Sequence, residues 1–183
     1  MSNLSTTTAV ASTFSADSVE DGQSRVLDVA GGKGDVSVEL AQHGVACTVV
    51  EPNLRAKPAK RRVAGGGSGA AHAIQWRQAT FVGDETDLPE FDLIVGLHPD
   101  QATEPIVDAA LQTRKAFAVV PCCVFASERP RIVRTKGGQD RAVVSYGEFV
   151  DYLQQKAAAA GRSCHLAFLP VRGKNRVLYA HAP

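Results

Sequence analysis

Short apolar runs alternate with polar, glycine-containing segments along most of the chain. Runs of roughly 4–8 apolar residues predict strands, and apolar positions three and four residues apart predict helices. The strands expected from this pattern cover residues 25–29, 46–50, 74–82, 91–97, 116–125, 163–169 and 176–181. The expected helices cover residues 34–43, 103–115 and 146–160, and the polar, basic segment 126–143 is expected to be a loop.

Strands that alternate with helices predict an α/β fold with a mostly parallel sheet and helices on both faces. The last two of the seven expected strands are joined by residues 170–175, which suits a C-terminal antiparallel hairpin. Residues 1–22 are rich in Ser and Thr and are expected to form a flexible arm. Residues 23–183 have the length of one ordinary domain.

The first expected strand ends in a glycine-rich turn, within the sequence RVLDVAGGKGD at residues 25–35. A strand, a glycine turn and a helix in this order are typical of nucleotide-binding α/β domains. Glycine lets the backbone approach a ligand closely, and the helix that follows offers unpaired N–H groups. The alternative is an ordinary strand-to-helix turn that needs glycine for its geometry alone.

Acidic residues stand at the ends of the first three expected strands. Glu51 ends the second strand, where a carboxylate can accept hydrogen bonds from both hydroxyls of a ribose. Asp84 follows the third strand, within reach of an adenine amine. Asp28 stands beside the glycine turn, where it disfavours a diphosphate and favours an ammonium group or an ordered water. Asp28 therefore favours S-adenosylmethionine over NAD as the ligand.

In their order and spacing, these motifs resemble the class I S-adenosylmethionine-dependent methyltransferases over residues 24–183. The segment DVAGGKG is similar to their first motif, with Ala30 in place of the usual first glycine. TVVEP and FVGDETDLP are similar to the second and third motifs, and FDLIVGLHPD and AFAVVPCCVF to the next two strands. The resemblance implies a Rossmann-like fold, S-adenosylmethionine as cofactor, and cofactor contacts from Asp28, Ala30, Gly31, Gly32, Gly34, Glu51, Asp84 and His98.

The segments HPDQATE and VVPCCVF are also similar to motifs of tRNA 2′-O-methyltransferases that act on the acceptor stem, which implies an RNA acceptor. The chain departs from that pattern at Pro99–Asp100, where a Cys-Gly pair is common. Methyl transfer needs an acceptor held in line and often a base nearby. The candidate catalytic residues are His98, Asp100, Cys122 and Cys123. His98 can instead bind a loop backbone, and Asp100 can instead cap the next helix.

The four cysteines show no CxxC spacing. This predicts free thiols, a reducing cytoplasmic compartment and no metal site. Cys122 and Cys123 are neighbours on an expected strand, so their side chains are expected to point to opposite faces. Cys47 and Cys164 are expected to be buried packing residues.

The formal net charge is +1, which excludes a chain that is basic throughout. Basic residues gather in segments 55–62 and 129–141, which follow expected strands and would suit a polyanionic substrate unless they are ordinary solvated loops. No apolar run is long enough to cross a membrane. A catalytically silent methyltransferase-like binding subunit and an NAD(P)-binding protein remain as alternative functions. The sequence does not indicate an oligomeric state.

Overall fold

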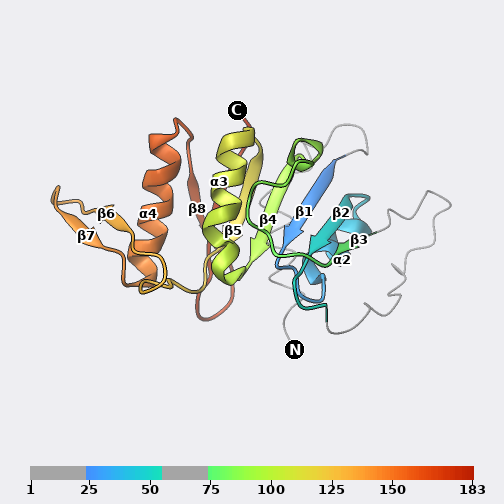
Figure 1. The fold of residues 1–183 in the computed structure, drawn as a ribbon, viewed down its shortest axis with the longest axis horizontal. Helices are drawn as coiled ribbons and strands as arrows, with labels where there is room; N and C mark the ends of the chain where they lie inside the picture. Colours follow the sequence, from blue (N-terminus) through green and yellow to red (C-terminus); the bar gives the residue numbers. More distant parts are fainter. Residues whose placement is uncertain (1–23, 55–73) are drawn as a thin grey trace.

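A seven-stranded sheet lies at the centre of the structure, a computed structural model that describes residues 24–54 and 74–183 (Figure 1). The strands lie in the order β3-β2-β1-β4-β5-β9-β8. Their bounds are β1 Arg25–Val29, β2 Ala46–Val50, β3 Gln75–Arg77, β4 Leu93–Leu97, β5 Ala116–Val120, β8 His165–Phe168 and β9 Arg176–Ala180. The arm expected at residues 1–22 and the basic segment 55–62 lie outside the described residues.

Strand direction confirms the expected class of sheet. The five strands from β3 to β5 pair in parallel, whereas β9 is antiparallel to both of its neighbours, β5 and β8. The sheet is therefore mostly parallel and closes with a C-terminal antiparallel hairpin. Strand β1 lies between β2 and β4, so the chain changes direction across the sheet at β1. Ligands of open α/β sheets bind beyond the carboxyl ends of the strands at such a switch point.

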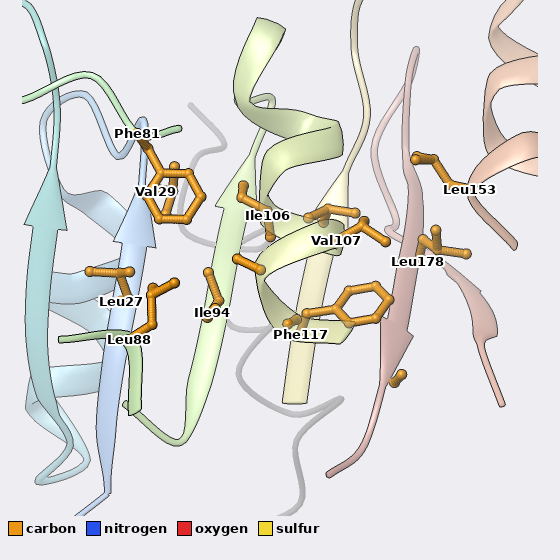
Figure 2. Close-up of a cluster of buried hydrophobic side chains, with 14 of the residues drawn as sticks. Leu27, Val29, Phe81, Leu88, Ile94, Ile106, Val107, Phe117, Leu153 and Leu178 are labelled. Carbon is orange, nitrogen blue, oxygen red and sulfur yellow. The ribbon is translucent and has the colours of Figure 1, made fainter. Parts of the chain in front are cut away.

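Helices cover both faces of the sheet, as expected. Side chains alternate along a strand, so Val26 and Leu27 of β1 point to opposite faces. Val26 packs in one apolar cluster with α2 (Asp35–Gln42). Leu27 packs in the larger cluster with α3 (Thr103–Thr113) and α4 (Tyr146–Ala159) (Figure 2). Among the described residues, no helix has the length and apolar character needed to cross a membrane.

Local chemistry explains where two of the helices begin. Gly34 precedes α2 with a φ of 72°, a left-handed conformation that glycine adopts without strain. Ser145 precedes α4 and forms a capping box with Glu148. The Ser145 side chain accepts the Glu148 N–H, and the Glu148 carboxylate accepts the Ser145 N–H over 2.8 Å.

Strand β3 is much shorter than expected. The apolar pattern predicted a strand over 74–82, but regular pairing ends at Arg77, which lies opposite Val50 at the end of β2. A strand at the sheet edge extends only as far as its single neighbour, and Pro52 turns β2 away without an N–H to donate. The segment then turns, and Phe81 buries its ring in the core (Figure 2).

The segment after β5 also differs from the prediction. The strand ends at Val120 rather than at residue 125, because Pro121 has no N–H and the neighbouring strand β4 ends opposite Val120. Within the expected loop 126–143, β6 (Ile132–Arg134) and β7 (Asp140–Ala142) form a separate two-stranded sheet. Val133 is buried in the core cluster that includes residues of α4, and this burial stabilises the hairpin.

Candidate functional site

The turn between β1 and α2 is held in a left-handed backbone conformation. Ala30, Gly32 and Gly34 have φ values of 53°, 55° and 72°. The Ala30 N–H donates to the Val50 carbonyl over 2.8 Å, and the Gly34 N–H donates to the Gly31 carbonyl over 2.7 Å. The positive φ of Ala30 costs about 1 kcal/mol, and the hydrogen bond to β2 holds it in place. Ala30 therefore adopts a backbone conformation that glycine would adopt without strain.

The three glycines of the turn have different surroundings. A Cβ on Gly31 would lie 2.8 Å from the Asp28 carboxyl carbon, and a Cβ on Gly34 would lie 2.6 Å from the Trp76 ring. Glycine is thus required at both positions by packing inside the protein. A Cβ on Gly32 would meet no atom within 4 Å. Gly32 is the glycine at which the turn faces open space and a ligand can approach.

Asp28 lies beneath the turn and is fully buried. Its Oδ2 accepts a hydrogen bond from the Ser37 hydroxyl over 2.8 Å, whereas its buried Oδ1 has no hydrogen-bond partner. Burial raises the pKa of Asp28 to about 6, against the opposing hydrogen bonds from Ser37. A buried carboxylate with one unpartnered oxygen is unfavourable by itself, and such groups concentrate at functional sites.

Glu51 stands at the end of β2 with its carboxylate beside the glycine turn. Oε2 accepts the Gly32 N–H over 3.1 Å, and Oε1 accepts the Asn53 N–H over 2.9 Å. The pairing of β1 with β2, which sets Val29 opposite Val50, brings the two strand ends together. The structure thus joins two of the predicted cofactor-binding positions, Gly32 and Glu51.

Asp84 follows β3 in an irregular segment and is exposed. The neighbouring Glu85 stabilises this segment, because its carboxylate accepts the N–H groups of Val82 and Gly83, each over 3.0 Å. Gly83 packs against α3, since a Cβ there would lie 3.0 Å from the carbonyl oxygen of Pro105. The Asp84 carboxylate is therefore carried on a loop that passes the start of α3.

The chain after β4 has an unfavourable backbone at two predicted catalytic residues. His98 has a φ of 56° and Asp100 a φ of 47°, and neither is glycine. The His98 N–H donates to the Val120 carbonyl over 3.1 Å, which ties this turn to the end of β5. The His98 side chain is exposed. Partial burial and the positive charge of Lys174 lower its pKa, and Asp100 opposes this shift. Strain of this kind concentrates at functional sites.

The predictions for Asp100 and the paired cysteines need correction. Asp100 makes no side-chain cap to α3; its Oδ1 accepts a hydrogen bond from the Cys122 thiol over 3.0 Å. The two cysteines do not point to opposite faces, because β5 ends before them. The ligand atoms of Asp100, Cys122 and Cys123 all lie within 4.8 Å of one another. Burial, with the Asp100 contact, raises the pKa of the Cys122 thiol to about 12, which argues against a thiolate nucleophile.

The Glu104 side chain is the centre of a partly buried network of hydrogen bonds. It accepts hydrogen bonds from Arg131, Tyr152 and Lys156, each over 2.6 Å. Burial raises the pKa of Glu104, but these hydrogen bonds outweigh burial and bring the pKa to about 2. Arg131 belongs to the basic segment 129–141 and is buried here, so it is not part of an exposed basic surface.

The sequence contained only a partial signal for this network. Tyr152 and Lys156 are four residues apart on α4 and thus share one helix face. No pattern in the sequence indicated that they contact Glu104 on α3 or Arg131, which directly precedes β6. Arg134, a second member of the basic segment, pairs with Asp140 on the surface over 3.6 Å.

Comparisons with known proteins identify the fold alone. No family model and no curated protein sequence matches the chain. The methyltransferase domain of bacterial-CtHen1-CN is similar in structure, with a TM-score of 0.64 and 15% identity over 98% of each chain. Magnesium protoporphyrin IX methyltransferase (ChlM) from Synechocystis PCC 6803 with bound S-adenosylmethionine has a TM-score of 0.58 and 16% identity over 96% of this chain and 77% of that chain.

The glycopeptide N-methyltransferase MtfA in complex with S-adenosylmethionine is also similar, with a TM-score of 0.57 and 13% identity over 98% of this chain and 93% of its own. These neighbours confirm the predicted Rossmann-like class I methyltransferase fold. The finer resemblance to tRNA 2′-O-methyltransferases is not shown by them.

Proposed function

We propose that the chain is an S-adenosylmethionine-dependent methyltransferase that binds its cofactor at the carboxyl edge of β1, β2 and β3. The observation that carries this proposal is the contact between Glu51 and Gly32. This contact holds the Glu51 carboxylate beside Gly32, the one glycine of the turn that faces open space. A carboxylate there can accept hydrogen bonds from both hydroxyls of a ribose.

The residues at this edge fit the polar groups of S-adenosylmethionine. The buried carboxylate of Asp28 lies under the turn, and its negative charge would favour an ammonium group above the turn. Glu51 supplies acceptors for the ribose, and the exposed carboxylate of Asp84 supplies an acceptor for the adenine amine. When bound, the cofactor supplies an electrophilic methyl group on a sulfonium. Structures of MtfA with S-adenosylmethionine, S-adenosylhomocysteine and sinefungin support a cofactor of this type.

NAD fits the same residues poorly. A diphosphate at the glycine turn would lie close to the carboxylate of Asp28, and two negative groups there would repel each other. The third glycine of a dinucleotide fingerprint is also missing. Ser37 stands in its place and donates its hydroxyl to Asp28. The buried Asp28–Ser37 pair thus discriminates between the two cofactor classes.

His98 is the proposed base. Its lowered pKa keeps the imidazole neutral at physiological pH, so the ring can accept a proton from the methyl acceptor. Asp100 is not proposed as the base, because its carboxylate already accepts a hydrogen bond from the Cys122 thiol. His98 and Asp100 both stand in the strained turn that follows β4.

RNA is the proposed acceptor class, with tRNA as the first candidate. This part of the proposal rests on the similarity of the segments at 98–104 and 119–125 to motifs of tRNA 2′-O-methyltransferases. The basic segment 129–141 contributes less to RNA binding than its sequence suggests, because Arg131 is buried against Glu104. Arg129, Lys136 and Arg141 remain exposed.

Calorimetric titration of the purified chain with S-adenosylmethionine, S-adenosylhomocysteine and NAD tests the cofactor class. We expect both adenosyl sulfur compounds to bind and NAD not to bind. Tight binding of NAD alone would overturn the proposal. Transfer of a tritiated methyl group to bulk tRNA then tests the acceptor, with His98→Ala as the variant expected to lose transfer. Cofactor binding without transfer to any acceptor class would identify a binding subunit instead.

A further inference from the structure

We propose that Asp100, Cys122 and Cys123 form a binding site for a zinc ion that leaves one coordination position open. Among the described residues, this is the one group of three or more His, Cys, Asp or Glu side chains whose ligand atoms lie within 4.8 Å of one another. The spacing of cysteines along the chain does not reveal the group, because Asp100 follows β4 and the cysteines follow β5.

The fold brings these two strand ends together. Strands β4 and β5 are parallel neighbours, and their last residues, Leu97 and Val120, lie opposite each other. The hydrogen bond from the His98 N–H to the Val120 carbonyl extends this pairing beyond the strands. Asp100 is thereby held over the cysteines, and its carboxylate is 3.0 Å from the Cys122 sulfur.

The separations suit a tetrahedral zinc ion. Two sulfurs bonded to one zinc lie about 3.8 Å apart, and a sulfur and a carboxylate oxygen about 3.6 Å apart, given the usual bond lengths. The three ligand atoms already lie within 4.8 Å of one another, so small side-chain rotations are enough to reach this geometry. Each thiol would release its proton to solvent on binding the ion, including the proton that now joins Cys122 to Asp100, and both sulfurs would bind as thiolates.

The donor set selects the kind of ion. Two thiolates and one carboxylate match zinc, whereas magnesium and calcium require oxygen ligands alone. Three protein ligands are typical of zinc sites that keep a position free for water or substrate, while structural sites have four. Asp100 stands two residues after His98, the proposed base, so an ion at this site could hold a water or the methyl acceptor near that residue. That role rests on the proposed function, whereas the metal site itself does not.

Titration of the reduced chain with cobalt(II), followed by displacement with zinc, tests the site. We expect one equivalent of cobalt to give the visible bands of a tetrahedral ion and a sulfur-to-cobalt charge-transfer band in the near ultraviolet. Cys122→Ser and Cys123→Ser should each weaken cobalt binding at least about tenfold and reduce the charge-transfer band. Asp100→Asn should weaken binding while the charge-transfer band persists at saturating cobalt.

Cys47→Ser and Cys164→Ser are matched controls, because both thiols lie outside the group and both variants should keep the wild-type spectrum. Thermal melting without metal shows whether each variant is folded. Absence of tetrahedral bands in the wild type, or their persistence in a folded variant that lacks Cys122 and Cys123, would overturn the site. Cobalt binding needs no cofactor, so its result is separate from the titration with S-adenosylmethionine.

Discussion

The carboxylate of Glu51 accepts a hydrogen bond from the backbone N–H of Gly32 over 3.1 Å, so one side chain joins the end of β2 to the turn after β1. Glu51→Ala would remove this link and the proposed acceptors for the ribose hydroxyls. We expect affinity for S-adenosylmethionine to fall by about 1–3 kcal/mol in a calorimetric titration. Glu90→Ala removes an exposed glutamate that pairs with Arg25 and should leave the affinity unchanged. Wild-type affinity in Glu51→Ala would remove Glu51 from the site.

Asp28→Asn is expected to stabilise the unliganded protein at neutral pH. Burial raises the pKa of Asp28 from 3.8 to about 6, so the folded state binds a proton more tightly than the unfolded state. The free energy of unfolding therefore decreases as pH rises from about 4 to about 6, by roughly 3 kcal/mol in all. Asparagine carries no charge and can still accept the Ser37 hydroxyl.

Urea denaturation at a series of pH values measures this effect. The stability advantage of Asp28→Asn should be small near pH 4 and should grow to a plateau above the folded-state pKa. Asp151→Asn, an exposed substitution on α4, controls for the loss of one negative charge. A stability advantage that does not vary with pH would contradict the raised pKa of Asp28. Binding of S-adenosylmethionine should weaken in Asp28→Asn.

Glu104→Gln should cost about 3 kcal/mol of unfolding free energy, because it leaves the buried Arg131 and the half-buried Lys156 without their carboxylate. The pKa of Glu104 is lowered to about 2, so its contribution is present above the unfolded pKa of 4.5 and is lost as pH falls toward 2. Urea denaturation at pH 7 and at pH 3 measures both effects. Asp140→Asn breaks an exposed pair with Arg134 and should cost less than about 0.5 kcal/mol. Equal losses in the two variants would refute the network.

His98→Gly separates backbone strain from chemistry. Glycine removes the strain of a φ of 56°, worth about 1 kcal/mol, so the variant should be as stable as the wild type or more so. Methyl transfer to the acceptor of the wild-type protein should nevertheless be lost. Arg114→Gly is the matched control, since Arg114 has a φ of 57° at the end of α3, near the amino end of β5 and away from the carboxyl ends of the strands. It should gain similar stability and keep full transfer activity.

The sequence predicts the strands that are buried on both faces and the turn that follows the first of them. β1 and β2 begin and end where expected. Each is a mainly apolar run, and a glycine or proline within two residues of its last residue marks where it ends. The length of β3 was not predictable, because it depends on where β2 stops pairing. Local patterns indicate which segments form strands, but the neighbouring strand determines how far an edge strand continues.

The candidate site was predicted in the same uneven way. Gly32 and Glu51 are recognisable because each stands within three residues of the end of a predicted strand, and parallel strands bring such positions to one edge. The Glu104 network was missed because Arg131 and Lys156 are distant in the sequence and are brought together only by packing. Asp100 and Cys122 were both predicted as site residues, but their contact depends on a strand that ends before Pro121 and on an unusual backbone at Asp100.

Titration of Gly32→Ala and Gly44→Ala with S-adenosylmethionine is the decisive measurement for a cofactor site at the glycine turn. Both glycines have positive φ, 55° and 83°, and a Cβ at either would meet no protein atom within 4 Å. Each substitution should therefore cost a similar amount of stability, about 1 kcal/mol. We predict wild-type affinity in Gly44→Ala and at least about a tenfold loss in Gly32→Ala, where the methyl group would enter the space of the ligand. Equal affinity in the two variants would contradict a cofactor site at this turn.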